Sequence, residues 1–143
     1  MFLDNKDSAR AQGDIGEARA IYEFTKMGYL ISIPTSTHCP YDLIIDDGQK
    51  LQRVQVKTSQ YEREFSATKS YEVCLATSAM TQENRNRKFA KTERTQEYDL
   101  LFVLTGDGKV WIIPEDKIEG KFTISLNQNG KYARYLTETS SAW

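Results

Sequence analysis

The residues best suited to chemistry are Asp42 and, thirteen positions later, the run Gln55–Lys57. Side chains alternate between the two faces of a β-strand, so Gln55 and Lys57 share one face. Together the two segments offer a carboxylate, an amide oxygen and an ammonium group. Such oxygens suit a hard cation such as Mg²⁺, and a neighbouring lysine can orient the attacking water. The pattern therefore indicates phosphodiester hydrolysis, provided that the two segments are neighbours.

Each residue of this set has a predicted role. Asp42 is the main metal ligand, Gln55 offers its side-chain carbonyl, and the backbone carbonyl of Val56 lies alongside. Lys57 orients or helps to deprotonate water and stabilises charge near the scissile phosphate. Glu17 completes the acidic cluster from a helix. The predicted catalytic set is therefore Glu17, Asp42, Gln55 and Lys57, and the predicted metal ligands are Asp42, Gln55, Val56 and Glu17.

Two predicted strands carry the central residues. Residues 41–46 form a short apolar segment, residues 51–58 form the next, and Asp46–Gln49 has the composition of a hairpin turn. A hairpin makes the two strands antiparallel neighbours. This arrangement would bring Asp42 beside the Gln55–Lys57 segment.

Glu17 belongs to the first predicted helix, residues 13–27. Asp14 is the expected N-cap, Glu17 has the spacing of a capping box, and Gly28 is the expected stop. A helical wheel puts Glu17 within the face that should be buried, and a buried carboxylate is costly unless it is paired or binds metal. Glu17 therefore either caps its own helix or joins Asp42. Other residues expected toward the core are Ile15, Ala18, Ala20, Ile21, Tyr22 and Phe24, with Arg19, Glu23 and Lys26 on the far side.

The remaining pattern predicts one small α/β domain with a mixed sheet of about five main strands. Residues 98–105 form a nearly continuous apolar run, typical of a buried central strand. Further strands are expected at 29–34, 71–77 and 109–114, weaker ones at 121–126 and 132–136, a short helix at 115–118 and a polar loop with helical turns at 79–97.

Composition narrows the class of protein. A chain of 143 residues with 39% hydrophobic and 27% charged residues suits one globular domain. No run approaches the ~20 apolar residues that cross a membrane, and the N-terminus has no secretory pattern, so a cytoplasmic protein is expected. Cys39 and Cys74 lack the spacing of a zinc site or a disulfide framework, which predicts two reduced thiols.

Charge is unevenly distributed along the chain. The net charge is −1, yet residues 85–94 contain five basic residues and one acid. This run is either a phosphate-contact surface or a solvated loop. Lys6 and Arg10 form either an arm on the DNA backbone or a frayed tail, and Tyr61–Glu64 is a candidate base-reading loop. The predicted DNA-binding residues are Lys6, Arg10, Thr58, Ser59, Arg63, Arg85, Arg87, Lys88, Lys91 and Arg94.

The quoted motifs resemble the PD-(D/E)XK nuclease superfamily. The resemblance is carried by Glu17, Pro40–Asp42, Gln55–Lys57 and Lys109–Pro114, and it extends over roughly residues 13–118. It implies an α/β restriction-endonuclease-like core, with a mixed central β-sheet flanked by helices. It also implies Mg²⁺ or Mn²⁺ as cofactor and one domain over residues 1–143. In that domain an N-terminal arm covers about 1–12 and a variable part covers about 119–143.

Within the superfamily, the chain most resembles homing endonucleases encoded in bacterial group I introns. That likeness implies a site-specific double-strand break made by a homotetramer, in a bacterial cytoplasm near the nucleoid. The chain departs from the superfamily pattern at Gln55, because most of the superfamily has Glu or Asp at that position. An amide carries no charge, so Glu17 matters more. A Holliday-junction resolvase-like nuclease and a catalytically inactive DNA-binding module remain the alternatives.

Overall fold

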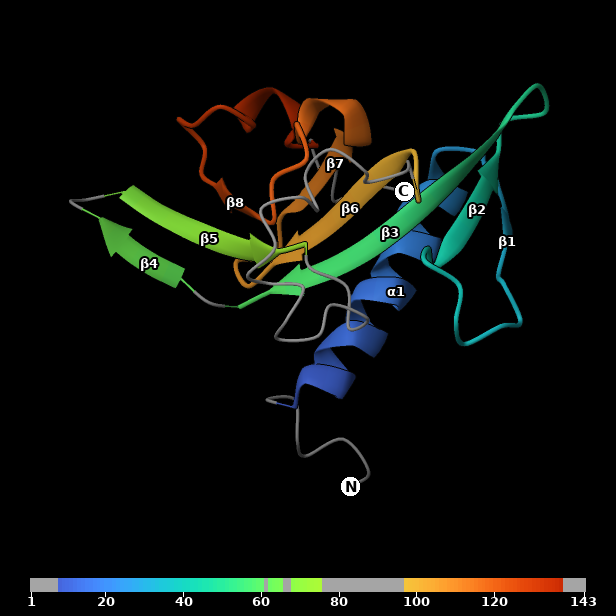
Figure 1. The fold of residues 1–143 in the computed structure, drawn as a ribbon, viewed down its shortest axis with the longest axis horizontal. Coiled ribbons are helices and arrows are strands. Elements are labelled where there is room, and N and C mark those ends of the chain that lie inside the picture. Colours follow the sequence, from blue (N-terminus) through green and yellow to red (C-terminus); the bar gives the residue numbers. More distant parts are fainter. Residues whose placement is uncertain (1–7, 61, 66–67, 76–96, 138–143) are drawn as a thin grey trace.

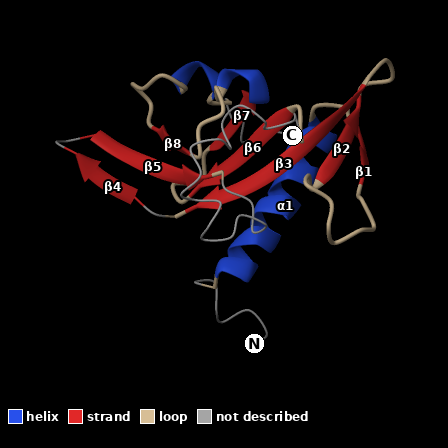
Figure 2. Cartoon of the chain, in the orientation of Figure 1, coloured by secondary structure: helices blue, strands red, loops and turns tan. Residues whose placement is uncertain are grey.

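A computed structural model describes residues 8–60, 62–65, 68–75 and 97–137. Its main layer is a five-stranded mixed sheet in the order β1-β2-β3-β6-β7 (Figures 1 and 2). β3 and β6 run parallel and the other neighbouring pairs are antiparallel. The strands are β1 (Leu30–Ser32), β2 (Leu43–Asp46), β3 (Leu51–Ser59), β6 (Leu100–Thr105) and β7 (Val110–Pro114). The predicted mixed sheet is confirmed, as is the hairpin between β2 and β3.

A second sheet extends from the far end of β3. It has the order β4-β5-β8, with β4 (Glu62–Phe65), β5 (Thr68–Cys74) and β8 (Thr123–Leu126). The strand predicted at 71–77 is β5, which begins earlier and belongs to this sheet. The prediction of a loop at 61–64 is wrong for Glu62–Glu64, which lie on β4. Their alternation of charges lacks the apolar signal by which a strand is usually detected.

The helix α1 (Ala9–Lys26) begins four residues before the predicted start. Its N-cap is Ser8, whose hydroxyl accepts a hydrogen bond from the Ala11 N–H at 3.1 Å. The prediction of Asp14 as N-cap is therefore wrong, because Ser8 is also a good cap and good helix formers follow it. The predicted stop is confirmed: Gly28 adopts φ +95° directly after the last turn.

The buried stripe of α1 is rotated relative to the wheel prediction. The buried positions are Gly16, Ala20, Glu23 and Phe24. Ile15 and Tyr22, expected in the core, are 46% and 47% exposed. Glu23, expected in solvent, is buried because Arg19 one turn earlier donates to its carboxylate at 2.7 Å.

Two apolar clusters pack on opposite faces of the main sheet. Phe102 and Leu104 of β6 pack with α1 residues on one face, while Leu101 and Val103 join residues of β5 and β8 on the other. This double burial confirms the predicted central strand at 98–105. Figure 1 shows α1 on one side of the main sheet, with β4 and β5 projecting beyond the end of β3.

Two short 3₁₀ helices complete the described fold. η2 (Glu115–Lys117) confirms the short helix predicted at 115–118. η3 (Ala133–Tyr135) replaces the strand predicted at 132–136, of which only a single bridge from Leu136 to Trp111 remains. The predicted loop at 79–97 falls almost entirely outside the described residues.

None of the helices in the described part of the chain is long and apolar enough to cross a membrane.

Candidate functional site

Asp42 lies directly before β2, beside the middle of β3. The ladder pairs Leu43 with Val54, and the Asp42 N–H donates to the Val54 carbonyl at 2.9 Å. The Asp42 carboxylate turns toward β3, where its Oδ2 accepts from the Val56 N–H and from Gln55 Nε2, both at 2.7 Å. The predicted meeting of Asp42 with Gln55 is therefore confirmed in space.

The Gln55 amide links two oxygens of this site. Its Nε2 donates to Asp42 Oδ2 and, at 3.3 Å, to the backbone carbonyl of Val56. These are two of the oxygens predicted to bind metal, and one electropositive N–H₂ group now lies within reach of both. In this structure the nitrogen of the Gln55 amide, rather than its oxygen, faces Asp42. Half a turn of the terminal amide exchanges the two atoms without moving the rest of the side chain.

The Asp42 carboxyl is subject to opposing electrostatic effects. Burial raises its pKa, and the Val56 N–H, the Lys57 charge and the Gln55 amide only partly oppose that effect. A cation beside Asp42 would favour the ionised form. The half-buried carboxylate and the Val56 carbonyl therefore fit a hard divalent cation, with Lys57 near enough to act on the same charge.

Glu17 approaches the same site from α1. It lies in the middle of the helix, so the capping alternative is excluded. It is exposed rather than buried, because the buried stripe passes through Gly16 instead. Desolvation raises the pKa of Glu17, and the charges of Asp42 and Asp14 raise it further. Glu17 is thus within electrostatic reach of Asp42, as a cluster of acids around a cation requires.

Gly16 sets the approach of α1 to β3. A Cβ at this position would lie 2.3 Å from Thr58 Oγ1, so any larger residue would force the two elements or the Thr58 side chain to shift. Thr58 Oγ1 also donates to the Gln12 carbonyl at 2.9 Å. This tight contact fixes the position of Glu17, the residue after Gly16, relative to β3. Sequence reasoning missed it, although a glycine inside a helical pattern is a signal of close packing.

Several predicted DNA contacts require correction or fall outside the described residues. Ser59 is 5% exposed and its hydroxyl donates to the Glu72 carbonyl at 2.5 Å, so it faces the interior rather than a phosphate. The Thr58 hydroxyl donates its proton to the Gln12 carbonyl of α1 rather than to a phosphate. Arg10 is exposed on α1 rather than part of an arm, and Arg63 lies on β4. The predicted residues Lys6, Arg85, Arg87, Lys88, Lys91 and Arg94 lie outside the described residues.

Within the described ranges, no group of three or more His, Cys, Asp or Glu side chains gathers to hold a metal. A metal centre here would consequently depend on oxygens of other kinds. The Gln55 amide and the Val56 carbonyl are oxygens of this kind, in addition to Asp42 and Glu17.

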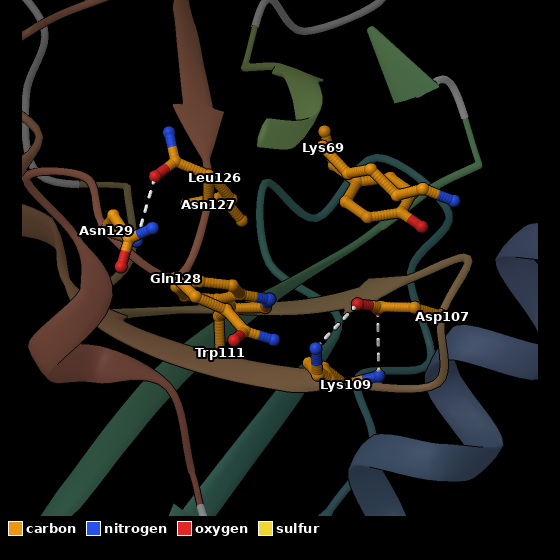
Figure 3. Close-up of a pocket in the computed structure, with 9 residues that line it drawn as sticks. Lys69, Asp107, Lys109, Trp111, Leu126, Asn127, Gln128 and Asn129 are labelled. Carbon is orange, nitrogen blue, oxygen red and sulfur yellow. Dashed lines mark hydrogen bonds and ion pairs between the residues drawn. The ribbon is translucent and has the colours of Figure 1, made fainter. Parts of the chain in front are cut away.

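A hollow of about 270 Å³ lies elsewhere, between β5, the β6–β7 turn and the end of β8 (Figure 3). Lys109 Nζ pairs with Asp107 Oδ2 at 3.1 Å in its wall, and Trp111 lies beneath. Lys109 and Asp107 compensate each other's charge, and the hollow contains none of the predicted catalytic residues. It is therefore separate from the Asp42 site.

The sequence profile of the PD-(D/E)XK endonuclease family matches residues 7–134. The chain belongs to this family. No curated protein matches the chain at a significant level. Among solved structures, the chain is similar to that of a bacterial homing endonuclease, I-Ssp6803I, with a TM-score of 0.66 and 23% identity. The match covers 90% of this chain and 88% of that one, and it confirms the restriction-endonuclease-like α/β fold.

Proposed function

We propose that this protein is a Mg²⁺- or Mn²⁺-dependent endonuclease that hydrolyses double-stranded DNA. The observation that carries the proposal is the position of the Gln55 amide nitrogen, within hydrogen-bonding reach of both Asp42 Oδ2 and the Val56 carbonyl. Both oxygens face one point, which now holds a positively polarised group. A cation at that point would favour the ionised form of Asp42, which burial disfavours.

Asp42, the Val56 carbonyl, the rotated Gln55 amide and Glu17 are the residues that would hold the divalent ion. When bound, the ion supplies charge neutralisation at the scissile phosphate and lowers the pKa of water. Lys57 holds its ammonium beside the reacting phosphate, where it orients the attacking water and stabilises the charge that develops on oxygen.

We further propose that the enzyme cuts one long DNA sequence, as a homing endonuclease does, and acts as a homotetramer in the bacterial cytoplasm, close to the nucleoid. The fold shared with I-Ssp6803I, described as a bacterial homing endonuclease, supports this choice over a junction resolvase. The membership of the family and the assembled Asp42, Gln55 and Lys57 support an active enzyme over an inactive DNA-binding module.

Plasmid cleavage tests the activity. Purified protein is incubated with supercoiled plasmids carrying inserts from many bacterial genomes, in Mg²⁺, Mn²⁺ or EDTA. We expect linear DNA from the plasmids that carry a few of the inserts, and only when a divalent ion is present. Cleavage of synthetic four-way junctions of unrelated sequence would favour the resolvase. Tight DNA binding without any cleavage would favour the inactive module.

Replacing Gln55 by Glu should tighten metal binding. The new carboxylate would put a second negative charge beside Asp42, so the metal-free variant should unfold at a lower temperature than wild type. Mg²⁺ should then raise the unfolding temperature of the variant by more than it raises that of wild type. Thermal unfolding in EDTA and in a Mg²⁺ series measures both effects. Gln52→Glu is the matched control, since Gln52 lies on the same strand with its side chain on the other face. An equal response to Mg²⁺ in Gln55→Glu and wild type would mean that Gln55 does not contact the ion.

Reversing two charges in the basic run should weaken binding to DNA of any sequence. In the double variant Arg87→Glu and Lys88→Glu, the slope of log K against log salt should fall by about 2, since each phosphate contact contributes about 0.9. Fluorescence anisotropy at several salt concentrations measures the slope. The control is Lys117→Glu with Lys131→Glu, which makes the same charge change at exposed lysines of the C-terminal part. A slope equal to that of wild type would assign residues 85–94 to a solvated loop.

A further inference from the structure

A groove of about 480 Å³ begins at Lys57. Its floor is the end of β3 from Lys57 to Ser59 and the following Gln60, one wall is Gln12 of α1, and the opposite wall is Glu72–Cys74 of β5. Figure 1 shows α1 and the end of β5 on either side of this part of β3. The volume lies in the range of pockets that hold small organic groups. The groove therefore extends directly from the proposed catalytic lysine.

Two consecutive hydroxyls of the floor hold the two walls in place. Thr58 donates to the Gln12 carbonyl of α1, and Ser59 donates to the Glu72 carbonyl of β5. The backbone of Ser59 is held as well, because the Gly106 N–H donates to the Ser59 carbonyl at 2.8 Å. The groove is thus formed before any ligand arrives, which reduces the entropy cost of binding. This explains why Thr58 and Ser59 turn inward rather than toward a phosphate.

The lining of the groove is nearly neutral. Among its residues, Lys57 and Glu72 are the charged ones, and their charges are opposite. A track for phosphates needs an excess of positive charge, so the walls beyond Lys57 are unsuited to the DNA backbone. Glutamine amides and the apolar atoms of Val73 and Cys74 instead suit the sugar and base of a nucleotide. Gln60 is exposed at the groove, and glutamine amides read base edges, adenine above all.

We propose that this groove receives the sugar and base edge of the nucleotide next to the cleaved phosphodiester, with Gln60 contacting the base. The inference rests on the proposed nuclease function. It makes Gln60 a specificity-determining residue. It also places the groove wall at Cys74 next to the bound DNA.

Cys74 allows occupancy of the groove to be measured. The chain has two cysteines, so Cys39→Ser leaves Cys74, which is exposed, as the single thiol. Its alkylation by N-ethylmaleimide is followed by mass spectrometry with and without cleavable plasmid, with Ca²⁺ replacing Mg²⁺. We expect the plasmid to slow alkylation several-fold. In the control Asp116→Cys, combined with Cys39→Ser and Cys74→Ser, the exposed thiol should react at the same rate with and without plasmid.

A bulky adduct tests whether the groove matters for cleavage. Coupling biotin-maleimide to Cys74 should reduce plasmid cleavage by about 10²-fold, because a displaced substrate is poorly aligned with Lys57. In a library with randomised bases around the cut, Gln60→Ala should lower base preference beside the cut by about tenfold. The matched control is Gln49→Ala, at the exposed β2–β3 turn, which should keep the wild-type preference.

The outcomes separate the two claims. Protection of Cys74, loss of cleavage with the adduct and altered preference in Gln60→Ala support the groove. If the unmodified protein cuts plasmid while Cys74 is unprotected and Gln60→Ala keeps the wild-type preference, the groove inference is overturned and the nuclease stands. If the unmodified protein cuts no DNA with any divalent ion, the proposed function fails and the groove inference fails with it.

Discussion

Replacing Asp42 by Asn is expected to abolish DNA cleavage while the folded protein becomes at least as stable as wild type. The carboxylate supplies the charged oxygen that accepts from both the Gln55 amide and the Val56 N–H. Loss of a metal ligand removes several kcal/mol of transition-state stabilisation, which corresponds to about 10³-fold or more in rate. Plasmid cleavage under single-turnover conditions measures the loss, and DNA affinity should change little.

The expected stability of the Asp42→Asn protein follows from the raised pKa of Asp42. Burial raises the pKa of Asp42, so keeping it ionised costs stability at every pH above that raised pKa. Asn removes this cost and can still accept the Val56 N–H bond. Thermal unfolding in EDTA at neutral pH is the measurement, with Asp116→Asn as an exposed control. An Asp42→Asn protein that cuts at the wild-type rate would exclude Asp42 as a metal ligand.

Replacing Lys57 by Ala is expected to lower the cleavage rate by about 10²–10⁴-fold, the range measured for loss of one general acid–base or charge-stabilising group. Lys57 acts on the charge of Asp42 and lies at the opening of the groove. Its assigned role is in the transition state rather than in affinity. DNA binding in Ca²⁺ should therefore stay near that of wild type, while the single-turnover rate falls.

Two further variants make the Lys57 result interpretable. Lys57→Arg keeps the charge but presents a broader, permanently protonated group, so a low rate in Lys57→Arg would indicate that proton transfer or precise placement is needed. Lys117→Ala removes an exposed lysine of η2 and should leave the rate unchanged. A Lys57→Ala protein with the wild-type rate but weak DNA binding would reassign Lys57 to backbone contact.

The parts of the site that sequence alone could predict are those set by local structure. Asp42 meets Gln55 because a short turn joins β2 to β3, and a hairpin with one buried face has little freedom of register. Leu101 to Leu104 alternate between two cores, which explains why the apolar run at 98–105 was a reliable signal of a central strand.

The parts that could not be predicted depend on partners distant in the sequence. Ser8 and Asp14 are both good caps, and the earlier start lies outside the predicted helix. Glu23 is buried only because Arg19 pairs with it, which a helical wheel does not take into account. Ser59 looks like a surface hydroxyl until β5 brings the Glu72 carbonyl within reach.

The same limit applies to Gln55. The sequence shows an amide where most members of the superfamily have an acid, but it gives no orientation for that amide. Its nitrogen faces Asp42 because hydrogen-bond donors stabilise a half-buried carboxylate. The two oxygens that this N–H₂ group contacts, Asp42 Oδ2 and the Val56 carbonyl, are not a cluster of acids, so a count of acidic residues does not detect them.

Anomalous scattering from crystals grown in Mn²⁺ shows whether a divalent ion binds at Asp42. We expect an anomalous peak between Asp42 Oδ2 and the Val56 carbonyl, with the Gln55 amide turned so that its oxygen faces the ion. The peak should be absent from Asp42→Asn crystals. An Mn²⁺ peak elsewhere in the molecule, with the Gln55 amide nitrogen still bonded to Asp42, would contradict a metal site at Asp42.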